Sequence, residues 1–304
     1  MYLKYYLEQL NCQNIPSFLI KYLKSPSLLR LRNVGYFCGM DYASKDIYNF
    51  SEYISRYDHS LTVSLIVYKL TNNMKMALAA LFHDIATPCF SHVIDYMNGD
   101  YEKQESTEEY TEYILRSDSY LINCLKEDNI DIDDIIDFKK YTVVDNDRPK
   151  VCADRIDGVI LTGFGWVKNV SKEGIRRIIQ DMTVFKNEFD DDEIGFKSYD
   201  IAKKVLEISR SIDIYCHSKE DNYIMQLLAK LTKLAISKGL ITYEELYSYD
   251  ERELFELLKD IKDKELMLLL NEFQNKKKDD IPDIDLPKVK VRSLNPLVNS
   301  KRLI

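Results

Sequence analysis

The sequence predicts a mainly α-helical protein that contains one small β-hairpin. The first observation is compositional, because a chain of 304 residues contains only 9 Gly and 7 Pro, the residues that most often interrupt helices. The second is periodicity, since apolar residues recur three and four positions apart along most of the chain, as on one face of a helix. The third is that one stretch, near residues 183–197, carries the alternation and turn residues of paired strands.

The first half of the chain is predicted to be almost entirely helical. Apolar positions at helical spacing predict helices in residues 1–24, from Pro26 and Ser27 onward, and in residues 59–73, 74–86, 105–127 and 148–163. The strongest pattern is that of residues 74–86, which we expect to end at Pro88 because proline breaks a helix. Residues 128–140 alternate acidic residues with isoleucines but lack the Gly and closing Glu of an EF-hand loop, so we interpret them as a solvated helix start.

The second half is predicted to begin with the hairpin and to continue as helices. The segments TVFKNEF and EIGFKSY flank an acidic turn at Asp190–Asp192, which is typical of two antiparallel strands. Further helices are predicted in residues 199–240 and 242–260. Residues 274–288 are charged and contain proline, which indicates a linker or surface crossing, and the alternation in residues 289–298 predicts a strand.

Charge and cysteine content exclude several classes of protein. The net charge of −8 argues against general binding of DNA or RNA, which needs clustered Lys and Arg, although a local basic pocket for a small phosphorylated substrate stays possible. The six cysteines include no CxxC pair, which excludes a zinc ribbon. Because no apolar run approaches about 18 residues and nothing resembles a secretory signal, we expect a cytoplasmic protein without a membrane span and with reduced thiols.

Histidine and aspartate residues form the one pattern that suggests chemistry. Of the four histidines, three lie close together in the sequence, and His83 is followed by Asp84. The dipeptide alone is weak evidence, but His59, His83–Asp84 and Asp154 fall on three separate predicted helices, and imidazole and carboxylate groups from rigid elements are what a divalent metal ion requires. A lone Asp154 among apolar neighbours is costly to bury unless a cation pairs with it. The alternative is that these are unrelated polar residues at helix ends.

The segments around these residues resemble a known family. RYDHSLTV (56–63), LFHDIATPCFSH (81–92) and ADRID (153–157) are similar, in order and spacing, to the successive signatures of HD-superfamily metal-dependent phosphohydrolases, closest to the subgroup related to deoxynucleoside triphosphate triphosphohydrolases. LLRLRNVGYFCG (28–39) and much of the C-terminal half resemble the same proteins, so the resemblance covers nearly the whole chain. It implies an HD-domain helical core and N-terminal helices in residues 1–182, and the hairpin, a helical C-terminal lobe and a tail in residues 183–304.

The resemblance also implies roles for individual residues. One divalent ion, which could be Mn, Fe, Mg, Co or Zn, would be bound by His59, His83, Asp84 and Asp154. Catalytic roles would fall to His92 and Asp95. Substrate contacts would be made by Arg56, Arg155, Tyr215, His217 and Lys219. The implied activity is hydrolysis of a phosphate ester or anhydride in a small phosphorylated substrate, with a dNTP-like nucleotide expected, and the implied assembly is a homo-oligomer.

The match departs from the family at four places. Thr87 stands where a catalytic histidine is usual, and the stretch around Glu102–Ser106 lacks a second family histidine, so that Glu102 or Glu105 is either an acid or base or simply an exposed residue. Tyr36 replaces a Gln that reads the sugar, and Gly158 replaces a Tyr. These departures leave two hypotheses open: an active phosphohydrolase, or a catalytically impaired HD module that acts as a nucleotide- or protein-binding scaffold or regulator.

Overall fold

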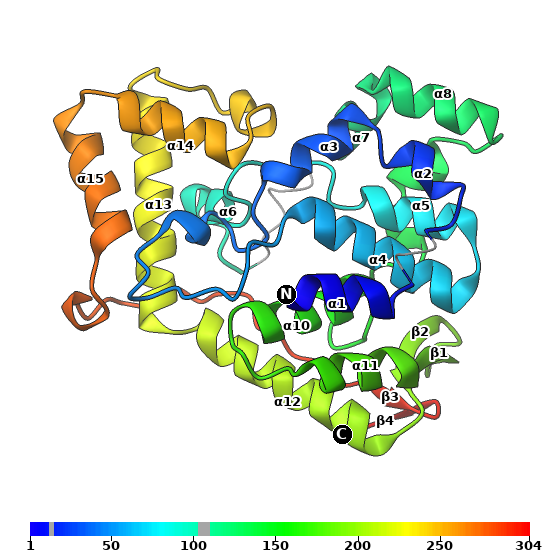
Figure 1. Cartoon of the computed structure of the whole chain (residues 1–304). Helices are drawn as coiled ribbons and strands as arrows, with labels where there is room; N and C mark the ends of the chain where they lie inside the picture. Colours follow the sequence, from blue (N-terminus) through cyan, green and yellow to red (C-terminus); the bar gives the residue numbers. More distant parts are fainter. Residues whose placement is uncertain (12–14, 103–109) are drawn as a thin grey trace.

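The computed structural model describes residues 1–11, 15–102 and 110–304, and it is mainly helical, which confirms the predicted fold class (Figure 1). The helices of the first half are α1 (Tyr2–Gln9), α2 (Leu19–Tyr22), α3 (Pro26–Arg30), α4 (Arg56–Thr71), α5 (Met74–Phe82), α6 (Val93–Asn98), α7 (Thr111–Ser117), α8 (Ser119–Glu127) and α9 (Asp133–Ile136). Those of the second half are α10 (Ala153–Gly165), α11 (Lys172–Asp181), α12 (Tyr199–Cys216), α13 (Lys219–Ser237), α14 (Glu251–Asp260) and α15 (Lys264–Asn275).

Helix α4 is the centre of the N-terminal half. Almost every residue of its first three turns is buried, because α5 packs along it on one side and α10 on another. The small polar side chains of α4 are satisfied within this packing; for example, the Ser64 hydroxyl donates to the Ala77 carbonyl of α5 at 2.7 Å. The N-terminal ends of α4 and α10 and the C-terminal end of α5 therefore come together, and this is where the candidate site lies.

Two predicted helices have different limits from those expected. Residues 105–127 were expected to form one helix, but the described part, from Tyr110 onward, contains α7 and α8, which are separated at Asp118. The Asp118 carboxylate accepts a hydrogen bond from the Leu121 amide at 2.9 Å and from the Ser25 hydroxyl at 2.6 Å, so it ends one helix and caps the next. The helix expected to reach Pro88 ends at Phe82, and a turn follows.

The predicted hairpin is confirmed, and it is part of a larger sheet. Strands β1 (Met182–Lys186) and β2 (Asp192–Phe196) are antiparallel, with Met182 opposite Phe196. Strand β3 (Leu297–Val298) pairs with β2 in parallel, and β4 (Lys301–Arg302) pairs with β3, so the sheet order is β1-β2-β3-β4. Gly195 permits this arrangement, because a Cβ there would lie 2.8 Å from both the Cβ and the carbonyl oxygen of Leu297.

The strand predicted in residues 289–298 is correct only at its end, and β4 was not expected. Residues 289–296 instead run as an extended segment whose backbone bonds to separate partners. The Arg292 amide donates to the Asp213 carboxylate at 2.7 Å, and the Asn295 amide donates to the Pro149 carbonyl at 2.8 Å. This segment joins the C-terminal helices to the sheet and passes α10 and α12 on the way (Figure 1). It carries side chains of the second half to the site.

One continuous apolar core runs through both halves of the chain. Buried side chains from α4, α5, α10, α12, α13 and α14 all belong to it. The division between residues 182 and 183 therefore stays a prediction. Among the described helices, none combines the length and apolar character needed to cross a lipid bilayer.

Candidate metal centre

His59 lies in the first turn of α4, and its ring is held in one orientation. Ser55 and Asp58 form a capping box that starts the helix. The ring atom Nδ1 lies 2.7 Å from Oδ2 of Asp157, which is buried and also accepts a hydrogen bond from the Tyr6 hydroxyl. Because a carboxylate only accepts, Nδ1 carries a proton, and Nε2 faces the other way.

His83 follows the last residue of α5, and one of its nitrogens has no partner. Nδ1 lies 2.8 Å from the Ala80 carbonyl and donates to it. Nε2 is buried and makes no hydrogen bond; it lies 3.6 Å from Oδ1 of Asp154 and 3.8 Å from Oδ1 of Asp84. Leaving a buried polar atom unsatisfied costs about 1–3 kcal/mol, so this nitrogen needs an explanation.

The carboxylate of Asp154 joins the two imidazoles. Its Oδ1 lies 3.1 Å from Nε2 of His59 as well as 3.6 Å from Nε2 of His83, and the three ligand atoms lie within 4.8 Å of one another. Atoms that share one cation at bond lengths of about 2.1 Å are separated by roughly 3–4 Å. Asp84 is adjacent, with Oδ2 3.7 Å from Nε2 of His59, and it accepts a hydrogen bond from Arg56 at 2.8 Å. The donor set fits a borderline divalent metal ion.

Charges within this cluster stabilise one another. Without a bound ion, burial lowers the pKa of His59, but hydrogen bonds with Asp154 and Asp157 outweigh it and raise that pKa to about 10; a metal ion would displace the proton from Nε2. Burial would raise the pKa of Asp84, but the positive charges of His83, Arg56 and His59 hold it at about 2. The carboxylates therefore remain ionised and attract positive charge to the point between them.

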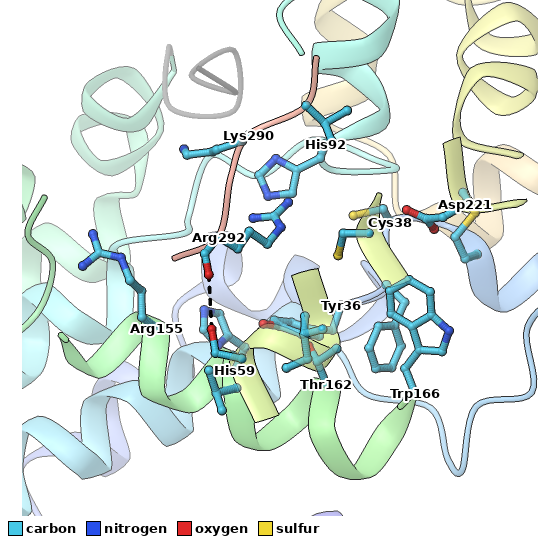
Figure 2. A pocket seen from close by; sticks show the side chains of 18 of the residues that line it. Tyr36, Cys38, His59, His92, Arg155, Thr162, Trp166, Asp221, Lys290 and Arg292 are labelled. Atoms are coloured by element: carbon cyan, nitrogen blue, oxygen red, sulfur yellow. Dashed lines mark hydrogen bonds between the residues drawn. The ribbon is translucent and has the colours of Figure 1, made fainter. Parts of the chain in front are cut away.

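A cavity of about 220 Å³ opens beside the cluster (Figure 2). His59 and Asp154 contribute to its wall. The positively charged side chains of the wall are Arg56, Arg148, Arg155, Lys290 and Arg292. Such a concentration of cations next to a candidate metal site suits the phosphate group of a small substrate.

His92 also lines the cavity, and Asp95 holds it in place. Nδ1 of His92 lies 2.9 Å from Oδ2 of Asp95, which is fully buried. Burial lowers the pKa of His92 more than Asp95 raises it, so the ring is uncharged near neutral pH. An uncharged imidazole that is oriented by a carboxylate can accept or donate a proton.

The structure brings some of the other predicted substrate residues to the cavity and leaves others outside its wall. Arg56 and Arg155 line it, and the Arg155 guanidinium is oriented by the Asp145 carboxylate at 3.2 Å and the Lys150 carbonyl at 2.7 Å. Three predicted residues at the junction of α12 and α13 do not line it: Tyr215, His217 and Lys219. Each has another contact. The Tyr215 ring packs against Trp166, the His217 ring donates a hydrogen bond to the Asp213 carbonyl, and the Lys219 ammonium donates to the Asp283 carboxylate.

Four candidate functional residues were not identified from the sequence. Asp157 is one turn from Asp154 in the same helix, so the D-x-x-D spacing could have indicated it. Arg148, Lys290 and Arg292 carried no local signal, because they reach the cavity from two segments that only the tertiary fold brings together. The two segments are in contact where the Arg148 guanidinium donates to the Ser293 carbonyl at 3.4 Å.

Two of the departures from the family pattern are complementary in space. Tyr36 and Gly158 both line the cavity, and a Cβ added at Gly158 would lie 2.9 Å from the Tyr36 hydroxyl. The missing side chain at position 158 therefore makes room for the tyrosine at position 36. The Tyr36 ring lies 5.1 Å from the His59 ring and 5.0 Å from the Arg56 guanidinium.

The other departures lie away from the cavity wall. Thr87 is buried, and its carbonyl accepts a hydrogen bond from Arg30 at 2.6 Å. Glu102 is exposed, and Glu105 lies outside the described residues. His92 is consequently the one histidine of the described cavity wall that does not belong to the metal cluster.

The residues of the metal cluster lie within a segment that matches a known family. Residues 56–157 match the HD domain. The matched segment begins at Arg56 and ends at Asp157, and it contains all four predicted metal ligands. HD domains are in general metal-dependent hydrolases of phosphorylated compounds, so the match supports a phosphohydrolase of the HD superfamily.

Similarity to a curated protein extends beyond the HD domain. The chain is 24% identical over 261 residues to the uncharacterized protein YdhJ of Bacillus subtilis (strain 168), and the aligned part covers 84% of this chain and 75% of YdhJ. The similarity therefore includes much of the C-terminal half, the half that contributes Lys290 and Arg292 to the cavity wall.

Proposed function

We propose that this protein hydrolyses a phosphate ester or anhydride of a nucleotide, with one divalent metal ion bound by His59, His83, Asp84 and Asp154. The observation that carries the proposal is the unpartnered Nε2 of His83, which is buried and faces the Asp154 carboxylate next to a cation-lined cavity. A metal ion would satisfy that nitrogen and balance the carboxylates at once.

The ligand set follows from the bonds that the two imidazoles already make. Each ring donates through Nδ1, His59 to Asp157 and His83 to Ala80, so each presents Nε2 to the ion. Asp154 completes the close group, and Asp84 is near enough to join it. When bound, a divalent ion would neutralise phosphate charge and lower the pKa of a water molecule, which supplies the nucleophile.

The protein's own side chains would do the rest of the work. Arg56, which is buried against Asp84, places a fixed positive charge beside the ligands, and the cavity's other cations would hold the phosphate oxygens and balance the charge that develops on them. His92, oriented by Asp95, would transfer a proton to the leaving oxygen or take one from the attacking water.

Support for a nucleotide comes from the other lining residues. Beyond the cations the wall is rich in aromatic side chains, namely Tyr36, Phe37, Tyr48, Phe50, Tyr96 and Trp166. Planar rings suit stacking against a base, and a substrate with a charged end and a planar end matches the two kinds of wall. The resemblance to dNTP triphosphohydrolases favours the same substrate class.

A substrate panel tests the proposal directly. Purified protein would be incubated with Mn²⁺, Mg²⁺, Co²⁺ or Fe²⁺ and each of the common nucleotides, with release of phosphate, pyrophosphate or triphosphate measured, and bound metal would be quantified by elemental analysis. We expect release by the wild type and none by the double variant His83→Ala, Asp84→Ala. Nucleotide binding without any product would support the alternative, an HD scaffold, which the absence of a histidine at Thr87 favours.

A further inference from the structure

The wall of the cavity changes in character from one end to the other. In Figure 2, Arg155 and His59 lie on one side of the view, and Trp166 and Asp221 lie on the opposite side. Among the described residues that line the cavity, two are acidic, Asp154 and Asp221. Asp154 belongs to the metal cluster, so the presence of a second carboxylate at the aromatic end needs its own explanation.

Asp221 is held firmly in place. It lies in the first turn of α13 and is buried, and its Oδ1 accepts a hydrogen bond from the Tyr48 hydroxyl at 2.6 Å. Figure 2 shows its carboxylate next to the Cys38 side chain at the edge of the cavity. A carboxylate has about four acceptor positions, and the tyrosine occupies one of them, so acceptor capacity remains at this end of the cavity.

The side chains around Asp221 form an aromatic cluster. The Tyr48 ring lies 5.7 Å from the Trp166 ring, and the Phe37 and Phe50 rings are stacked at 4.2 Å. All four line the cavity. Aromatic walls with one fixed polar group at the edge are the usual features of a site that stacks a base and reads its hydrogen-bonding edge.

We propose that this end of the cavity is a nucleobase site in which Asp221 selects guanine. Guanine presents two neighbouring donors, N1–H and the 2-amino group, which match the two oxygens of one carboxylate. Adenine and cytosine place an acceptor next to their amino group, and uracil and thymine place their single N–H between two carbonyls, so each would bring a lone pair against the carboxylate. The inference rests on the proposed nucleotide phosphohydrolase function and names its substrate class.

The charges that face Asp221 are compatible with this role. Arg292 on the extended C-terminal segment and His217 at the end of α12 favour the ionised carboxylate, whereas burial opposes it and raises the pKa of Asp221 to about 7. Two N–H donors from a base would add to the groups that stabilise the ionised form. A base without these donors would leave the buried carboxylate unpaired, so the site would discriminate strongly against such a base.

A base series on the wild type is the first test. We expect kcat/KM for GTP or dGTP to exceed that for the adenine and cytosine nucleotides by about 10- to 100-fold, as for hydrogen bonds to a charged group. Inosine triphosphate keeps N1–H but lacks the 2-amino group, so it should lie between guanine and adenine. Equal rates for all bases, or a preference for adenine, would overturn the assignment.

The variant Asp221→Asn is the second test, because asparagine has the same shape and can still accept the hydrogen bond from Tyr48. We expect it to reduce the preference for guanine over adenine about 10-fold or more while hydrolysis of inorganic tripolyphosphate is unchanged. Asp200→Asn, at an exposed position of α12, is the matched control and should alter neither quantity. Full retention of the guanine preference in a folded Asp221→Asn would also overturn the assignment.

These measurements separate the failure of the inference from the failure of the proposed function. If polyphosphate and nucleotides are cleaved without regard to the base, the base site is wrong and the phosphohydrolase proposal stands. If nothing is cleaved, calorimetric titration of GTP and ATP into the Mn²⁺-loaded protein still measures the preference, and equal affinities would refute it. If Asp221→Asn does not fold, the guanine–inosine–adenine series on the wild type decides alone.

Discussion

The two ends of the cavity are built in different ways. The metal cluster comes from residues 56–157, where three helix ends converge and each imidazole is fixed by a bond through Nδ1. The opposite end is assembled from segments far apart in the sequence, including Tyr48, Trp166 and Asp221. The comparison teaches that the metal cluster comes from one compact stretch of sequence, whereas the rest of the cavity wall depends on packing between distant segments. The predictions below test this contrast, from the largest expected effect to the smallest.

Removing one imidazole should abolish metal binding. We expect His83→Ala to lower the metal content to near zero and to reduce phosphohydrolase activity by about a thousandfold or more, because the ion's charge is worth several kcal/mol in the transition state. Elemental analysis and steady-state kinetics would measure the two effects. His217→Ala is a matched histidine change outside the cavity wall and should retain the metal. Full metal occupancy in His83→Ala would contradict the proposed ligand set.

The cation supplied by the C-terminal segment should affect substrate binding more than turnover. Arg292→Gln removes a cavity cation supplied by the extended C-terminal segment, and we expect KM to rise about 10- to 100-fold for nucleotides of any base, with a smaller change in kcat. Arg292→Lys, which retains the charge, should recover part of the loss. An unchanged KM in Arg292→Gln would show that this segment does not contact the phosphate.

Loss of the hydrogen bond that orients His59 should reduce metal affinity less than loss of a metal ligand does. Asp157→Asn retains the shape but removes the charge that holds Nδ1, and the expected loss is about 10- to 100-fold in metal affinity. Competition with a chelator of known affinity would measure it. Tyr6→Phe, which removes only the hydrogen bond from the Tyr6 hydroxyl to Asp157, should have a smaller effect in the same direction. Equal metal affinity in Asp157→Asn and wild type would exclude an orienting role.

A buried carboxylate joins α14 to the segment between α5 and α6 and should make stability depend on pH. Glu251, the first residue of α14, accepts a hydrogen bond from the Phe90 amide at 3.1 Å, and its Oε2 is buried without a partner. Burial, with a contribution from Asp41, raises its pKa from 4.5 to about 8. The folded state therefore binds more protons than the unfolded state between about pH 4.5 and 8, and Glu251 lowers stability as the pH rises through that window.

Glu251→Gln should remove this contribution. We expect the Tm of the variant relative to that of the wild type to increase by at least about 2 °C between pH 5 and pH 8, because the neutral amide cannot ionise. Thermal unfolding followed by circular dichroism at several pH values would show it. A Tm difference that stays constant across this range would mean that Glu251 is not protonated in the folded protein.

The smallest effect is expected at the contact between Tyr36 and Gly158. In a Tyr36→Phe background, Gly158→Ala should stabilise α10 by about 0.5–1 kcal/mol, since Ala is the better helix former. With the Tyr36 hydroxyl present, the added methyl group meets it at 2.9 Å, and that gain should be lost or reversed. Chemical denaturation of the four proteins of this cycle measures the coupling, and additive effects would show that the two positions are independent.

Much of the fold could be predicted because helix and hairpin signals are local. Apolar spacing located α4, α5 and α10, and the turn at Asp190–Asp192 located the β1–β2 hairpin. The break at Asp118 was missed, because that residue ends α7 partly through a bond to Ser25, far away in the sequence. Strand β4 was missed for the same reason, since its pairing depends on where β3 is brought by the rest of the chain.

The amino-acid sequence by itself determined which groups can do chemistry: His59, His83, Asp84 and Asp154 stand in short motifs whose spacing places them at helix ends, and helix geometry is set by neighbouring residues. Only the tertiary structure decided that Asp157 orients His59, that Tyr36 occupies the space left by Gly158, and that Arg292 and Asp221 meet at one cavity. Those contacts depend on the burial of apolar surface across the whole molecule, which no short stretch of sequence encodes.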